Sequence, residues 1–152
     1  MSAIVGSVQV ERSPDDVFGV AADPMRRAEW QESVSGVTVE PSAVAFAAGA
    51  RIRETRRVTG GARQLHWELS EYAPPEAWGF RGLDGPVRPV GRMTFTPSEG
   101  GGATRVDMMI DFEGHGPFGR LLAAVARRDA RRQVPLDLAG LKRVVEATGA
   151  RA

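Results

Sequence analysis

Residues 104–126 read TRVDMMIDFEGHGPFGRLLAAVA and contain the change of periodicity that decides the fold. Before the glycines, apolar side chains occupy every second position, as on a strand with one buried face: Val106, Met108, Ile110 and Phe112. After the glycines, apolar residues recur at intervals of three and four as far as Val145, which is the pattern of an amphipathic helix. We expect the apolar face of the strand to pack on the helix residues Leu121, Leu122, Val125 and Leu141.

Strand-like segments separated by turn residues precede this unit. Apolar alternation places strands at 3–11, 34–40, 51–58, 63–72, 77–81, 88–96 and 104–113. Turns such as Gly60-Gly61 join successive strands as hairpins, which favours an antiparallel sheet. Two short helices, 14–22 and 24–30, begin at Ser13-Pro14 and Asp23-Pro24, because Ser and Asp cap a helix and Pro fits its first turn.

Together these elements predict an α+β fold. A seven-stranded antiparallel sheet would pack against the long C-terminal helix, 117–148, with the two short helices after the first strand. Pro135 lies inside the long helix and is expected to kink it near Arg131–Arg132. A curved sheet around a helix encloses a concave, mostly apolar space, which is where small-molecule sites occur.

The composition indicates one globular domain of 152 residues, with 42% hydrophobic and 26% charged residues. The absence of Cys excludes disulfides, thiolate metal sites and a Cys nucleophile, and two His argue against a multi-histidine metal site. We therefore expect no metal and no cofactor. The chain has no run of 18 apolar residues and no basic leader at its start, so we expect a cytoplasmic protein without stable membrane insertion.

The charge is uneven along the chain although its net value is only +1. From Gly116 onward there are eight basic and three acidic residues, so that segment carries +5 and the first 115 residues carry −4. One helix face gathers Arg127, Arg128, Arg131 and Arg132. Such a face is most often simply solvated, but it is also suited to an acyl carrier protein, an anionic lipid surface or a partner subunit. Nucleic-acid binding is not expected, because the segment offers one aromatic residue, Phe118.

Glu54 and Arg56 are the candidate catalytic residues. They share the parity of Ile52 on the strand 51–58, so both point inward if Ile52 does. An inward carboxylate beside a guanidinium could orient a polar ligand or act in acid–base catalysis. Alternatively, a strongly twisted strand would bring both charges to solvent at the sheet edge.

The two histidines and the glycine-rich turn have structural interpretations. His66 has the opposite parity to Trp67 and should face away from the cavity, and His115 lies in the turn before the helix, with no Ser or Asp placed to form a triad. The segment 114–119 fits G-x-G-x-x-G, but no strand follows the helix as a dinucleotide-binding unit requires.

Several motifs resemble those of the START-like (SRPBCC) superfamily. They are VERSPDDVF at 10–18, Asp23-Pro24 leading to Trp30, WELSEYAPP at 67–75 with WGF at 78–80, and GRMTF at 91–95 with GGATRV at 101–106. Within the superfamily the chain is similar to the polyketide cyclase/dehydrase and lipid-transport branch. The resemblance implies a helix-grip fold, in which the curved sheet wraps the C-terminal helix around an internal cavity.

The resemblance also implies a function and a set of cavity residues. We expect binding of a hydrophobic or amphipathic small molecule, lipid or polyketide-like, and Trp30 and Trp67 should line a common cavity. The alternatives are a polyketide cyclase/dehydratase-type enzyme using Glu54, Arg56 and Trp67, and an interaction module using the basic helix. The lack of a recognisable nucleophile, metal set or cofactor motif favours binding. The expected lining is Trp30, Ile52, Glu54, Trp67, Leu69, Trp78, Phe80, Met93, Phe95, Met108, Ile110, Phe112, Phe118, Leu122 and Val125.

Overall fold

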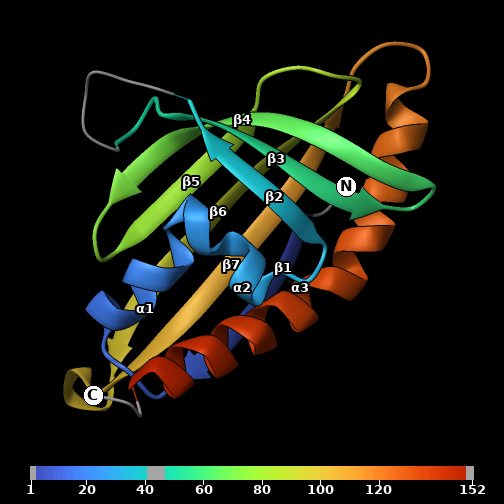
Figure 1. Ribbon diagram of the computed structural model, residues 1–152. Helices are drawn as coiled ribbons and strands as arrows, with labels where there is room; N and C mark the ends of the chain where they lie inside the picture. Colours follow the sequence, from blue (N-terminus) through green and yellow to red (C-terminus); the bar gives the residue numbers. More distant parts are fainter. Residues whose placement is uncertain (1–2, 41–46, 150–152) are drawn as a thin grey trace.

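The computed structural model describes residues 3–40 and 47–149 (Figure 1). In chain order the elements are β1 (Ile4–Val10), α1 (Pro14–Ala21), the 3-10 helix η1 (Pro24–Arg26), α2 (Arg27–Trp30), β2 (Val34–Val39), β3 (Arg51–Val58), β4 (Gly61–Ala73), β5 (Ala77–Gly82), β6 (Val87–Ser98), the 3-10 helix η2 (Glu99–Gly101), β7 (Ala103–Gly114) and α3 (Gly119–Gly149). The predicted α+β helix-grip fold is confirmed. The segment expected as one short helix, 24–30, is a 3-10 turn followed by a single α-helical turn.

The sheet has seven strands in the order β1-β7-β6-β5-β4-β3-β2, and every neighbouring pair is antiparallel. Successive strands from β2 to β7 are neighbours, whereas β1 lies beside β7 at one edge. Figure 1 shows the sheet curving around α3, which packs on β1 and β7. α3 therefore covers the side of the concave face that β1 and β7 form, and it leaves the other side of that face uncovered.

The register of β7 is the one that its alternation predicts. Val106 and Met108 are buried in the core, and Met109, of the opposite parity, is exposed on the other face of the sheet. On the helix side, Leu141 is fully buried but Leu121 is 66% exposed and Val125 is 37% exposed. The expectation that all four helix residues pack on the sheet is therefore wrong for the first turns of α3. A pocket separates those turns from the sheet, so their side chains line it or face solvent.

Close backbone packing holds the second half of α3. Gly140 lies directly against the backbone of Trp30, and a Cβ at this position would overlap the Trp30 carbonyl oxygen. α2 is thereby seated on α3 without an intervening side chain. Pro135 lies near the middle of α3, and Figure 1 shows the helix changing direction along its length. Because of this bend, the second half of α3 packs on the sheet and the first half lies farther from it.

Candidate functional site

A pocket of about 690 Å³ lies between the concave face of the sheet and the first half of α3. Its apolar lining consists of Val58, Leu65, Trp78, Phe80, Val87, Pro89, Met108, Ile110, Phe112, Leu122, Val125, Ala126, Ala130, Val134 and Leu136. Its buried polar lining consists of Arg27, Gln31, Ser33, Glu54 and Asp137, with half-buried Arg56 beside them. Apolar walls with a few convergent polar groups are the usual composition of a small-molecule site.

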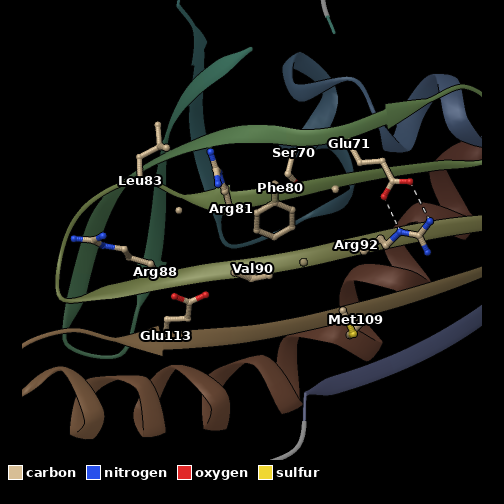
Figure 2. Close-up of a pocket in the computed structure, with 13 residues that line it drawn as sticks. Ser70, Glu71, Phe80, Arg81, Leu83, Arg88, Val90, Arg92, Met109 and Glu113 are labelled. Atoms are coloured by element: carbon tan, nitrogen blue, oxygen red, sulfur yellow. Dashed lines mark hydrogen bonds and ion pairs between the residues drawn. The ribbon is translucent and has the colours of Figure 1, made fainter. Parts of the chain in front are cut away.

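A second pocket, of about 570 Å³, lies on the opposite face of the sheet (Figure 2). Its charged groups are exposed or half-buried, and one pair joins Arg92 Nε to Glu71 Oε1 at 2.7 Å. Ion pairs accessible to water contribute little to stability, because water screens them. The inner pocket, where charges are buried, is therefore the candidate functional site.

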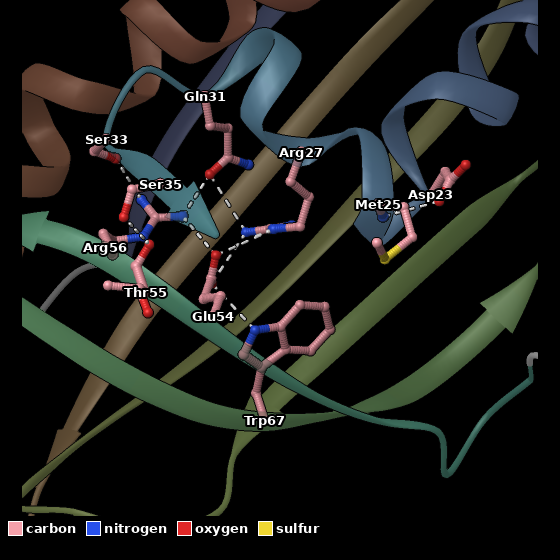
Figure 3. A network of polar contacts seen from close by, with 10 residues as sticks. All are labelled: Asp23, Met25, Arg27, Gln31, Ser33, Ser35, Glu54, Thr55, Arg56 and Trp67. Atoms are coloured by element: carbon pink, nitrogen blue, oxygen red, sulfur yellow. Dashed lines mark hydrogen bonds and ion pairs between the residues drawn. The ribbon is translucent and has the colours of Figure 1, made fainter. Parts of the chain in front are cut away.

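Glu54 is the centre of the polar cluster in the inner pocket (Figure 3). Its side chain is 3% exposed, and Arg27 donates from Nε to Oε2 and from Nη2 to Oε1, each at 3.4 Å. The indole Nε1 of Trp67 donates to Oε1 at 3.1 Å. Arg56 Nη2 lies 3.6 Å from Oε2. Glu54 thus faces the cavity, as its parity predicts, but its principal partner is Arg27 rather than Arg56.

Gln31 and Ser33 connect the two guanidinium groups. Gln31 Oε1 accepts from Arg27 Nη2 at 3.3 Å and also from Arg56 Nη2. Arg56 Nη1 donates to Ser33 Oγ at 3.1 Å. Figure 3 shows α2 and the turn after it bringing these side chains down onto β3. The network fixes both guanidinium groups before any ligand arrives, so the site is preorganised.

The electrostatics of the cluster keep Glu54 ionised. Burial alone would raise the pKa of Glu54, but the charges and hydrogen bonds of Arg27 and Arg56, with the Trp67 hydrogen bond, outweigh burial and lower it. Burial lowers the pKa of Arg27, which nevertheless stays charged because guanidinium pKa values are so high. The Arg27 guanidinium also lies 5.1 Å from the centroid of Trp67 and 5.7 Å from that of Trp78, where cation–π attraction stabilises it.

Asp137 on α3 is the second buried carboxyl group of the pocket. It is 3% exposed, and its Oδ1 has no hydrogen-bond partner among residues 3–40 and 47–149. Burial raises the pKa of Asp137 to about 6, with Glu54 and Glu32 adding to the rise and Arg56 and Arg27 opposing it. Asp137 is therefore the group of this pocket that titrates close to neutral pH.

The residues that α2 and α3 contribute were not predicted from the sequence. Arg27 and Gln31 belong to a helix of one turn and the residue after it, which is too short for a periodic pattern to show which side is buried. A signal for Asp137 does exist. It occupies one position of a stripe with helical spacing whose other members are apolar: Ala130, Val134, Leu141 and Val145. An acid in such a stripe indicates a buried carboxyl group.

The expected lining residues divide between this pocket and the packed core. The pocket lining includes Glu54, Trp78, Phe80, Met108, Ile110, Phe112, Leu122 and Val125, together with Arg56. It does not include the core residues Trp30, Ile52, Trp67, Leu69, Met93 and Phe95, all of them buried. Trp30 and Trp67, which were expected to line a common cavity, are both buried in the core, and neither lines this pocket. α1 packs on β6, β7 and α3 and fills another part of the concave face. Phe18 of α1, for example, packs edge-on against Phe95 with ring centroids 5.4 Å apart.

The positions of three more residues complete the comparison: Phe118, which was expected to line the cavity, and the two histidines. Phe118 lies just before α3 and is 73% exposed, so it lines no cavity. His66 faces away from the pocket. Its Nε2 lies 2.8 Å from Glu40 Oε1, and its Nδ1 lies 3.2 Å from Asp84 Oδ2. His115 is exposed in the turn before α3.

The four arginines at 127, 128, 131 and 132 of α3 do not form one free face. Arg127 Nε donates to Asp111 Oδ1 at 2.8 Å, and Arg132 Nη2 donates to Asp129 Oδ1 at 3.3 Å. Arg128 and Arg131 are exposed. The basic surface available to a partner is therefore narrower than the sequence pattern suggests.

Two observations on the described residues bear on metals and membranes. Within 3–40 and 47–149, His, Asp and Glu side chains nowhere gather in a group of three that could hold a metal ion. None of the helices in the same ranges combines the length and the apolar character needed to cross a bilayer.

Comparison with known proteins places the chain in a family. Two solved structures share the fold with a TM-score of 0.77: TTHA0849 from Thermus thermophilus (23% identity, covering 96% of this chain and 98% of that one) and the Zhui aromatase/cyclase from Streptomyces sp. R1128 (17% identity, 95% and 93%). The di-domain ARO/CYC BexL from the BE-7585A biosynthetic pathway has a TM-score of 0.72 at 18% identity, covering 96% of this chain and 47% of that one. No curated protein matches the chain by sequence. Residues 1–146 match the family model described as polyketide cyclase / dehydrase and lipid transport, and the chain therefore belongs to that family.

Proposed function

We propose that the protein binds a hydrophobic or amphipathic small molecule, of lipid or polyketide type, in the pocket between the sheet and α3. The observation that carries the proposal is the combination of an apolar lining with a buried, preorganised charge cluster in one pocket of about 690 Å³. This volume lies within the range of about 300–1,000 Å³ typical of ligand pockets. The apolar part of the ligand would lie on Phe80, Met108 and Ile110, and its polar end would meet the cluster around Glu54.

Two matched variants, each replacing an alanine of α3 by tryptophan, test the proposal. Ala126 lines the pocket and Ala124, two residues earlier, is exposed. Binding of the neutral apolar fluorophore N-phenyl-1-naphthylamine would be followed by its own fluorescence. We expect saturable binding to the wild type, at least about a tenfold weaker Kd for Ala126→Trp, and no change for Ala124→Trp, because each 1.4 kcal/mol of lost contact is tenfold in Kd. No saturable binding to the wild type, or equal binding by both variants, would contradict the proposal.

A second candidate function is a cyclase/dehydratase-type reaction in the same pocket. The observation that favours it is the inward, ionised Glu54 with Arg27 and Arg56 beside it, a carboxylate that can accept a proton next to guanidinium groups that can donate to a ketone oxygen. The lowered pKa of Glu54 makes it a weak base. Such an enzyme would receive its substrate as a thioester on an acyl carrier protein, for which the exposed Arg128 and Arg131 offer positive charge.

Turnover of a synthetic poly-β-ketothioester, followed by mass spectrometry for cyclised and dehydrated products, tests this second function. Glu54→Gln should lower the rate per folded molecule by on the order of 10²–10⁴-fold, the usual range for general acid–base catalysis. Absence of turnover by the wild type would leave ligand binding as the function, whereas turnover at an unchanged rate in Glu54→Gln would refute the role of Glu54 in it.

A further inference from the structure

Three buried polar atoms of residues that line the inner pocket have no hydrogen-bond partner among the described residues. They are the donors Arg56 Nε and Trp78 Nε1 and the acceptor Asp137 Oδ1. Folded proteins satisfy nearly all of their buried polar groups, because each unmet donor or acceptor is costly. Two donors and one acceptor around the same pocket are complementary to a ligand that carries an acceptor and a donor of its own.

Asp137 offers a buried acceptor that remains open at this pocket. The carboxylate of Glu54 is already engaged by Arg27, Arg56 and Trp67. Asp137 lines the pocket from α3. Its pKa is affected by the charges of Arg56, Arg27, Glu54 and Glu32, which belong to other segments of the chain. A hydroxyl group of a ligand that enters here meets Asp137 as the carboxylate whose Oδ1 is unoccupied.

The charge balance of the site argues against an anionic ligand. At the buried polar end of the pocket, Arg27 and Arg56 carry two positive charges, which Glu54 and ionised Asp137 balance. The other charged residues of the lining are exposed or half-buried: Glu32, Arg57, Arg63, Asp129 and Arg132. A ligand carboxylate placed against Asp137 would bring a third negative charge beside the two buried carboxylates of this cluster, and an uncompensated charge in a buried cluster is strongly unfavourable. A neutral polar group adds no charge and can still satisfy the three open atoms.

We propose that Asp137 selects the ligand by accepting a hydrogen bond from a ligand hydroxyl, while Trp78 and Arg56 donate to a ligand oxygen, so that the pocket prefers a neutral phenol or alcohol to a carboxylate. This inference rests on the proposed binding function and names the class of molecule that the site takes. Asp137 acts as acceptor when it is ionised, which for a pKa of about 6 holds above that pH.

Three naphthalene probes of similar size test the selectivity at pH 7.5. They are 2-naphthol, which carries a donor, 2-methoxynaphthalene, which lacks it, and 2-naphthoate, which is an anion. We expect the wild type to bind 2-naphthol about 10- to 100-fold more tightly than either of the others, the range for one hydrogen bond to a charged group. Binding would be measured by isothermal titration calorimetry.

Variants of Asp137 separate the roles of hydrogen bond and charge. Asp137→Leu removes the acceptor and should make the Kd values of 2-naphthol and 2-methoxynaphthalene equal within a factor of about 3. Asp137→Asn keeps an acceptor but removes the charge, and it should strengthen 2-naphthoate binding by about tenfold or more. The matched control is Glu146→Gln, which changes a carboxylate of the same helix that lies outside the pocket and already accepts from Lys142 Nζ at 2.7 Å. It should leave the order of the three probes unchanged.

The outcomes distinguish this inference from the function on which it rests. If the wild type binds none of the probes nor N-phenyl-1-naphthylamine, the proposed binding function fails. If the wild type binds the three probes equally, or if Asp137→Leu retains the preference for 2-naphthol, the role of Asp137 is refuted and the binding function stands. Circular dichroism spectra of each variant would establish that it is folded before its Kd is compared.

Discussion

The substitution Asp137→Asn should change how the stability of the ligand-free protein depends on pH. Burial raises the pKa of Asp137 from 3.8 to about 6. Below pH 3.8 the group is protonated in both the folded and the unfolded chain and contributes nothing. Between pH 3.8 and 6 the folded protein holds a proton that the unfolded chain has lost, so the free energy of unfolding falls as the pH rises. Above pH 6 the buried carboxylate carries its full cost.

The size of this effect follows from the pKa difference. At about 1.4 kcal/mol for each pH unit, a rise from 3.8 to about 6 corresponds to about 3 kcal/mol. Asn cannot ionise. The unfolding free energy of Asp137→Asn relative to wild type should therefore increase by up to about 3 kcal/mol as the pH goes from 3.5 to 7.5, with most of the increase between pH 4 and 7.

Urea unfolding of both proteins at half-unit steps from pH 4 to 8 would measure this difference directly. Other titrating groups are common to both chains, so their contributions cancel. Asp129→Asn is the control, since burial alone would raise the pKa of Asp129 but hydrogen bonds from Thr59 and Arg132 lower it, so its variant should show no such increase above pH 4. A difference between Asp137→Asn and wild type that stays flat over this range would refute the assignment of Asp137 as a buried, unpaired carboxyl group.

Three further substitutions test the packing and the charge cluster by urea unfolding. Glu54→Gln should lower the unfolding free energy by about 3–5 kcal/mol, because it leaves the buried Arg27 without its counter-charge, and a loss below about 1 kcal/mol would argue that water solvates Arg27. Gly140→Ala should cost about 1–3 kcal/mol, because the new Cβ overlaps the Trp30 carbonyl oxygen, and a neutral effect would mean that α2 can shift freely on α3. Phe118→Ser should change stability by less than about 0.5 kcal/mol, since this ring is 73% exposed, whereas a larger loss would place it in the core.

The fold could be predicted from the sequence because its signals are local. Alternation in β7, the hairpin glycines and the cap residues Ser13 and Asp23 each depend on a few neighbouring residues, and the structure contains the corresponding contacts. The inward direction of Glu54 followed from Ile52 in the same way, because parity along one strand fixes which residues share a face.

The contents of the site could be predicted only in part, because they depend on how distant elements meet. Arg27 reaches Glu54 only because Gly140 seats α2 on α3, and no local pattern encodes that contact. The extent of the pocket likewise depends on which part of the concave face is covered by packed side chains. Phe18 of α1 packs on Phe95 and closes one end, whereas the bend of α3 leaves the other end open. Apolar parity identifies the concave face but not which part of it is hollow.

The position of β1 at the edge beside β7 has a consequence for how the chain folds during synthesis. Ile4 of β1 pairs with Ile110 of β7, so β1 has no neighbouring strand until β7 has been synthesised. The hairpins from β2 to β6 can form from nearby residues, whereas closure of the core joins the two ends of the chain and needs α3 on β1 and β7 as well. Contacts of such long sequence separation slow folding. The nascent chain therefore exposes its apolar strands on the ribosome until β7 and α3 have been synthesised, and its yield in the cell should depend on chaperones that bind them.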